Sequence, residues 1–213
     1  MSYLVKGLAG AAGCSGLAGG GYWASKYLGS GEDSRSTAKS LIIDSGRTLL
    51  GVNSDQWVDR WSEYVNSGGN GFGIEGYSES SKNKSSVPDA FKNACLNKVN
   101  EKVSGTEDPL FQNLSTYCIS MTAITQLVTN EGREMLSDSN DGDGWNAAWT
   151  SYLSNPEGNK WNIPNWNTQT SGSVPQELKT NCTSKKAEKA YGVKDIKFQN
   201  VRDWCTKAKA VRH

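Results

Sequence analysis

The sequence CLNKVNEKVSGTEDPLFQNLSTYC, residues 95 to 118, returns as CTSKKAEKAYGVKDIKFQNVRDWC, residues 182 to 205. The two stretches align without a gap, are identical at 10 of 24 positions, and both begin and end with cysteine. Two unrelated stretches of ordinary composition would share about one or two identities. The sequence therefore predicts a duplicated unit.

The match extends upstream of these stretches. WVDRWSEY, residues 57–64, corresponds to WNAAWTSY, residues 145–152, and the Val-Pro pair at 87 and 88 corresponds to the pair at 174 and 175. We therefore expect an amino-terminal segment, residues 1–30, followed by a first module at 39–123 and a second at 125–210. A unit of about 85 residues is just large enough to enclose a core of its own.

The spacing of apolar residues predicts a mainly α fold, with two small tandem helical modules after an apolar amino-terminal segment. The expected helical elements are 41–50, 57–65, 88–105 and 111–121 in the first copy and 127–136, 145–152, 175–192 and 198–208 in the second. A glycine in the middle of the first element, Gly46 or Gly132, weakens the prediction there. Proline at the start of the third element is well placed for a first helical turn. The loops at 66–86 and 154–173 differ between the copies and are expected to form variable surface.

The four cysteines Cys95, Cys118, Cys182 and Cys205 form two pairs with the same spacing. One disulfide within each module is the simplest interpretation, although buried free thiols are an alternative. A disulfide closing a loop of this length stabilises a small unit by about 3 kcal/mol. Oxidised pairs would place the body of the protein outside the cytoplasm.

Two sets of aromatic residues invite different interpretations. The tryptophans at 57, 61, 145 and 149 recur at helical spacing, which favours a buried core over a platform for stacking ligands. Trp161 and Trp166, in KWNIPNWN, lie in an expected loop and are candidates for a contact surface.

Composition limits the chemistry that the chain can perform. The charge is nearly balanced, with 23 basic and 22 acidic residues, so the sequence gives no basic footprint for nucleic acid. The only histidine is His213, and the close cysteine pairs of a zinc knuckle are absent, so we expect no metal and no cofactor. A carboxylate-dependent hydrolase using Glu75, Asp141 or Asp143 is a less favoured alternative, because these residues do not recur in both copies.

The amino-terminal segment is free of charge from residue 7 to residue 25, GLAGAAGCSGLAGGGYWAS. Nineteen residues nearly suffice for a helix that spans a bilayer, so these residues are the expected membrane partner, as an anchor or uncleaved signal. Seven of them are glycine, which keeps a flexible Gly-rich tail as the alternative.

These features together resemble a known family. Lys6-Gly7 in a Gly/Ala-rich start, the GRTLL and GREML stretches, the paired tryptophans and above all FQNVRDWCT at 198–206 resemble uncharacterised paralogous proteins of hemotrophic mycoplasmas. The resemblance implies a membrane-associated or surface-displayed product of a large multigene set, without an established activity.

The expected function is therefore that of a non-enzymatic protein at the cell membrane, with its body extracellular. The expected partner is a host surface molecule, and divergence of the loops fits antigenic variation. The alternative is an intracellular helical scaffold with reduced cysteines.

Overall fold

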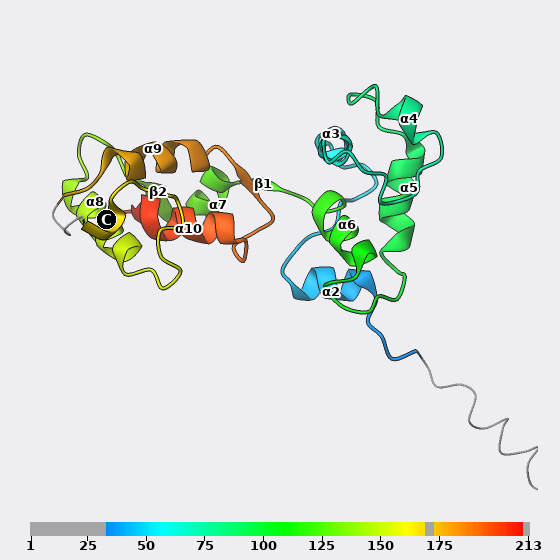
Figure 1. Cartoon of the computed structure of the whole chain (residues 1–213), viewed down its shortest axis with the longest axis horizontal. Helices are drawn as coiled ribbons and strands as arrows, with labels where there is room; N and C mark the ends of the chain where they lie inside the picture. The colour runs from blue at the N-terminus through cyan, green and yellow to red at the C-terminus, as the bar shows by residue number, and fades with distance from the viewer. Residues whose placement is uncertain (1–32, 169–172, 211–213) are drawn as a thin grey trace, which may run out of the picture. The chain divides into compact units, whose positions relative to one another are not determined.

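The computed structural model describes residues 33–168 and 173–210 (Figure 1). The chain divides into two units, residues 1–34 and 35–213, and the fold described below belongs to the second. The expected apolar segment, residues 7–25, lies outside the described residues. Within the described residues, helices predominate and the strands are two or three residues long, so the predicted mainly α fold is confirmed.

The first part of the described chain contains helices α2 (Ala38–Asp44), α3 (Trp57–Asn66), α4 (Tyr77–Ser80), α5 (Asp89–Lys98) and α6 (Pro109–Tyr117). These helices and the segments between them bury one hydrophobic cluster, which runs from Ala38 to Ile119 along the chain. Its largest fully buried side chains are Trp61, Tyr64, Phe91, Ile42 and Leu114.

The second part contains α7 (Ile124–Asn130), α8 (Gly142–Leu153), the 3-10 turn η1 (Trp166–Thr168), α9 (Gln176–Lys185) and α10 (Ile196–Cys205). A second hydrophobic cluster runs from Ile124 to Cys205, and none of its buried residues belongs to the first cluster. Its largest fully buried side chains are Trp149, Tyr152, Phe198, Ile124, Ile163 and Leu178. Each part of the chain thus buries its own apolar side chains.

Short antiparallel pairings fasten the helices of the second part. Strand β1 (Thr122–Ala123) pairs with β3 (Lys189–Ala190), and β2 (Arg133–Met135) pairs with β4 (Thr206–Ala208). In the first part, single antiparallel bridges at the matched positions join Thr37 to Lys102 and Leu49 to Ile119.

An aspartate begins the last helix of each part in the same way. Asp108 precedes α6 and accepts a hydrogen bond from the backbone N–H of Leu110 at 2.9 Å, and Asp195 precedes α10 and accepts one from Lys197 at 3.0 Å. The second carboxylate oxygen accepts from the backbone of Ser104 or Tyr191. These N-caps satisfy amide groups that a helix start leaves without partners.

Several predicted helix boundaries are wrong, and glycine explains one class of error. The first element of each copy ends as a helix at Asp44 or Asn130 and then turns through Gly46 or Gly132, whose φ angles are +82° and +68°. Glycine adopts this left-handed conformation without a steric penalty, so the chain leaves the helix there and continues as an extended segment.

The other errors concern helix ends and one helix face. The third element ends at Lys98 or Lys185, well before Gly105 or Gly192, and the fourth ends at Tyr117 or Cys205. Apolar spacing alone predicts that Val58 of α3 is buried with Trp57 and Trp61, but Val58 is 43% exposed.

Candidate functional site

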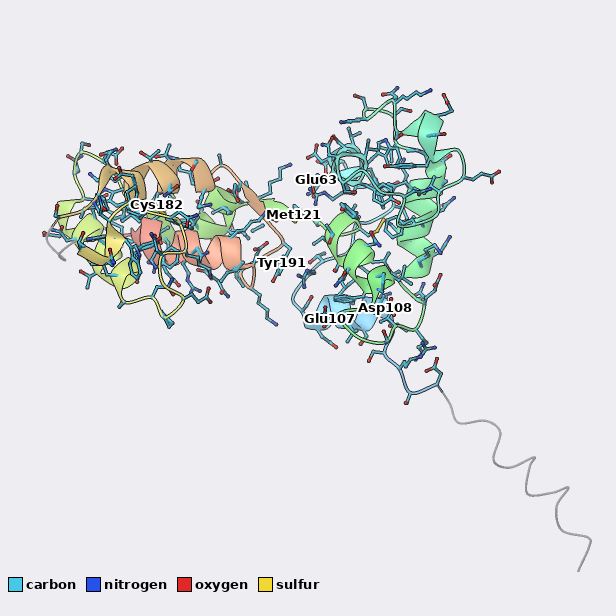
Figure 2. All side chains as sticks on the ribbon, viewed as in Figure 1. Glu63, Glu107, Asp108, Met121, Cys182 and Tyr191 are labelled. Atoms are coloured by element: carbon cyan, nitrogen blue, oxygen red, sulfur yellow. A yellow bond between two sulfur atoms is a disulfide. The ribbon has the colours of Figure 1, made fainter. Side chains whose placement is uncertain are left out.

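The four cysteines lie where the helices converge inside each cluster. Cys95 in α5 is bonded to Cys118 at the end of α6, and Cys182 in α9 is bonded to Cys205 in α10 (Figure 2). The Cα–Cα distances are 5.3 and 5.6 Å, within the range of about 7 Å that a disulfide allows. The equal cysteine spacing therefore predicted the correct pairing.

The repeated tryptophans are part of the core. Trp61 and Trp149 are fully buried, and Trp57 and Trp145 are only 4% and 3% exposed. The indole N–H groups of Trp57, Trp61 and Trp145 donate to backbone carbonyls, for instance that of Asn83 for Trp61, at 3.1 Å. This confirms the core interpretation and leaves these rings inaccessible to a stacking ligand.

Trp161 does not form the contact surface proposed from its loop position. It is 9% exposed and meets Trp204 edge to face, with ring centroids 4.8 Å apart. Trp166 is partly buried against the same cluster. The burial of Trp161 corrects the expectation for that residue, whereas Trp166 keeps part of its surface exposed.

The loops expected to be variable surface are tied to the core by one repeated arrangement of hydrogen bonds. In the first copy, Asn70 accepts from the Tyr64 hydroxyl at 3.1 Å and from the backbone N–H of Ile74 at 2.7 Å, and its amide donates to the Ile74 carbonyl at 2.9 Å. The Tyr64 hydroxyl in turn accepts from the backbone N–H of Phe72 at 2.8 Å. Burial raises the pKa of Tyr64.

The second copy forms the same contacts. Asn159 accepts from the Tyr152 hydroxyl at 2.7 Å and from Ile163 N–H at 2.8 Å, and it donates to the Ile163 carbonyl at 2.8 Å. The Tyr152 hydroxyl accepts from Trp161 N–H at 2.8 Å. We call each arrangement a loop anchor: Tyr64 with Asn70 in the first copy, and Tyr152 with Asn159 in the second.

Sequence reasoning missed the loop anchors, although a signal is present. NGFGI at 70–74 and NKWNI at 159–163 share asparagine, an aromatic residue and isoleucine at alternate positions. The two asparagines are 89 residues apart, whereas the other matched residues are 86 to 88 apart. An alignment that keeps the spacing of the other matches therefore does not pair these two segments.

The three carboxylates of the hydrolase alternative do not form a catalytic group. Asp141 accepts from Ser137 N–H at 2.7 Å and pairs with Lys207, and these partners, Lys207 first, lower the pKa of the Asp141 carboxyl. Glu75 and Asp143 are exposed. Within the described ranges, the structure shows no contact between any two of these three side chains, and no group of three or more His, Cys, Asp or Glu residues placed to hold a metal ion.

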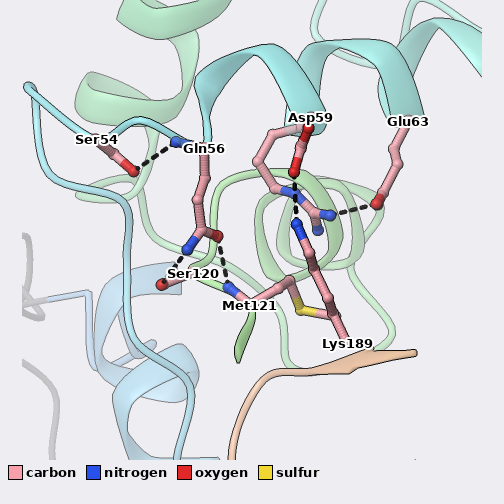
Figure 3. A network of polar contacts seen from close by, with 8 residues as sticks. Ser54, Gln56, Asp59, Glu63, Ser120, Met121 and Lys189 are labelled. Carbon is pink, nitrogen blue, oxygen red and sulfur yellow. Dashed lines mark hydrogen bonds and ion pairs between the residues drawn. The ribbon is translucent and has the colours of Figure 1, made fainter. Parts of the chain in front are cut away.

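A polar network fixes the chain segment that connects the two copies. Gln56, at the start of α3, accepts from the backbone N–H of Met121 at 2.8 Å and donates to the Ser120 hydroxyl at 3.3 Å (Figure 3). Asp59 on the same helix pairs with Lys189 at 2.6 Å, which lowers the pKa of Asp59. Because both charges of this ion pair are about half exposed, it adds little stability.

A cavity with a volume of about 440 Å³ lies in the first copy. We call it the apolar groove. Its walls are Ile43 of α2, Leu49 and Leu50 of the extended segment, Leu96 of α5 and Val99 directly after that helix, together with the Cys95–Cys118 disulfide. Two cationic side chains, Lys39 and Arg47, also line it. Apolar walls with a few polar groups are typical of small-ligand sites, which span about 300 to 1,000 Å³.

Residues at the groove differ between the copies even though the scaffold around them is matched. By the sequence alignment, Ile43, Leu96 and Val99 correspond to Thr129, Thr183 and Lys186. The second copy therefore places polar side chains where the first has the apolar walls of the groove.

The arginine of the GRTLL and GREML stretches also differs in its partners. In the second copy, Arg133 donates from Nε to the Thr206 hydroxyl at 2.7 Å. In the first copy, isoleucine 119 stands at the matched position and offers no such acceptor, and the Nε of Arg47 is buried without a hydrogen-bond partner.

Comparison with known proteins finds no matching family model, curated protein or solved structure.

Proposed function

We propose that this chain is a non-enzymatic display protein built from two tandem copies of one helical module, residues 39–123 and 125–210. The observation that carries the proposal is the matched set of contacts. The disulfide, the loop anchor and the aspartate N-cap each occur twice, at aligned positions. Three separate kinds of contact at matched positions support duplication of a whole folding unit.

The proposal places the module outside the cytoplasm. Both disulfides are buried in their clusters, and structural disulfides form and persist in oxidising compartments. Among the described residues, no helix has the length and apolar character needed to cross a bilayer. The proposal gives attachment to the membrane to the uncharged residues 7–25, in keeping with the resemblance to membrane-associated or surface-displayed paralogues of hemotrophic mycoplasmas.

The partner proposed for the displayed body is a host surface molecule. The loop anchors support this role because they fix each loop at one asparagine, one aromatic residue and one isoleucine, whereas most of the other loop positions differ between the copies. A scaffold that holds its loops at a few points tolerates substitution at the remaining exposed positions. Antigenic variation would use this tolerance.

Protease treatment of intact cells tests the proposal. We expect trypsin to cleave the body of the protein on intact cells, after partial reduction if the folded modules resist. The matched control is a cytoplasmic protein of the same cells, which must stay uncut until lysis. A body that stays uncut on intact cells but is cleaved after lysis would refute display and favour the intracellular scaffold.

A further inference from the structure

We propose that the apolar groove of the first copy binds an anionic amphiphile, namely a fatty acid whose hydrocarbon tail lies along the walls and whose carboxylate meets Lys39 and Arg47. The site goes beyond the display function and does not depend on where the protein resides.

The apolar walls of the groove can bind the hydrocarbon tail of the fatty acid. Ile43 is 53% exposed although it is a large aliphatic residue, and it lies at a cavity whose other walls are leucine, valine and a disulfide. Covering such surface with a hydrocarbon chain removes apolar area from water, at about 25 cal/mol for each Å². A cavity of about 440 Å³ falls within the range of small-ligand sites, so we commit to a single chain as its occupant.

The two cationic side chains, Lys39 and Arg47, can bind the carboxylate of the fatty acid. Within residues 33–168 and 173–210, neither Lys39 nor Arg47 forms an ion pair with a carboxylate. The contacts of the Arg47 guanidinium are a hydrogen bond to the Ser45 hydroxyl at 2.7 Å and a position over the Tyr191 ring, 4.1 Å from its centroid. Two uncompensated cations beside an apolar cavity are complementary to an anion that carries an apolar tail.

The second copy shows what the same scaffold looks like without these features. Threonine 125 stands at the position of Lys39, and Thr129, Thr183 and Lys186 replace three apolar wall residues. Arg133, the counterpart of Arg47, is held by Thr206. The groove therefore arises from substitutions on a retained framework, and residues taken from the second copy provide conservative ways to remove it.

The experiment is calorimetric titration of the oxidised full chain with dodecanoate below its micelle concentration. We expect one site in the chain. Dodecanol has the same tail and no charge, and it should bind at least about tenfold more weakly because it loses the charge-assisted hydrogen bond. Acetate has the charge and no tail, and it should also bind at least about tenfold more weakly because it buries no hydrocarbon against the walls.

Two variants test the two halves of the site. Lys39→Gln should weaken dodecanoate binding by about tenfold without affecting dodecanol. The double variant Ile43→Thr/Leu96→Thr, which copies the second module, should weaken both ligands. Lys92→Gln, on α5 but not among the groove residues, is the matched control and should bind dodecanoate like the unaltered chain.

Circular dichroism of each variant establishes that it is folded before titration. No binding of dodecanoate by the unaltered chain would overturn the proposal. So would equal binding of dodecanoate and dodecanol, or binding that the Ile43→Thr/Leu96→Thr variant leaves unchanged. None of these results bears on the protease experiment, so the ligand proposal and the display proposal fail separately.

Discussion

Replacing Tyr152 with phenylalanine removes one hydroxyl from the loop anchor of the second copy and leaves the rest of the residue in place. The ring is fully buried and stacks on Trp149, with centroids 5.4 Å apart and planes at 14°. Phenylalanine retains this packing, so the substitution isolates the contribution of the hydrogen bonds from that of the ring.

The structure sets the size of the effect. The hydroxyl donates to Asn159 and accepts from Trp161 N–H. Asn159 Oδ1 keeps its second bond, from Ile163 N–H, so the substitution leaves one buried donor, Trp161 N–H, without an acceptor. Such a group costs about 1–3 kcal/mol, and we expect the free energy of unfolding to fall by about 2 kcal/mol.

The assay is urea-induced unfolding of the full chain, followed by circular dichroism. Tyr64→Phe disturbs the matched anchor and should destabilise its own module by a similar amount, because Phe72 N–H then lacks its acceptor. Tyr191→Phe is the control: its hydroxyl donates to the Lys194 carbonyl in an exposed contact, so the loss should stay within about 0.5 kcal/mol. If both anchor variants lose less than this control, the loops are not held by these hydroxyls and the reasoning is refuted.

Three further predictions follow from the core, the disulfide and the charges. Trp149→Ala should lower the free energy of unfolding by about 3–5 kcal/mol, as should Trp61→Ala, since both rings are fully buried; a loss under about 1 kcal/mol in calorimetry would contradict their burial. Replacing Cys182 and Cys205 together by serine should cost about 3 kcal/mol in urea unfolding, because the bond closes a loop with a sequence separation of 23; an unchanged midpoint would exclude the bond. The pKa of Asp141 is lowered in the folded state, so its contribution to stability is present above its ordinary value of 3.8 and is lost as the pH falls through the lowered pKa. Asp141→Asn should therefore lower the melting temperature more at pH 7 than near pH 2, and equal effects at both values would exclude the ion pair with Lys207.

Some parts of the fold could be read from the sequence because they depend on local spacing. Trp57, Trp61 and Tyr64 recur at intervals that place them on one helix face, and burial of that face follows from the hydrophobic effect. The disulfides could be predicted because the two cysteine pairs have equal spacing. Both features can be predicted from spacing alone, without knowledge of any other contact between distant residues.

Other parts depend on contacts that spacing does not reveal. The loop anchors join α3 or α8 to an asparagine six or seven residues beyond the tyrosine, and the asparagine acts through side-chain bonds that have no periodic pattern. The burial of Trp161 could not be predicted for the same reason, because its packing against Trp204 brings together residues far apart in the chain.

The groove could not be predicted from either copy alone. Its walls come from α2, the extended segment and the end of α5, and its cationic character comes from Lys39 and Arg47. The alignment of the copies does contain the differences, such as valine 99 against lysine 186. Only the fold shows that these differences surround one cavity.

The most direct test of the account is disulfide mapping of the protein isolated from its native cells, with free thiols blocked by acid and alkylation at the moment of lysis. The central claim is that two copies of one module, each closed by its own disulfide, are displayed outside the cytoplasm. It predicts that mass spectrometry of the digested protein finds the peptides of Cys95 and Cys118 joined, and those of Cys182 and Cys205 joined, without alkylated forms of these four residues. Recovery of all four as alkylated thiols, or pairing between the copies, would contradict it.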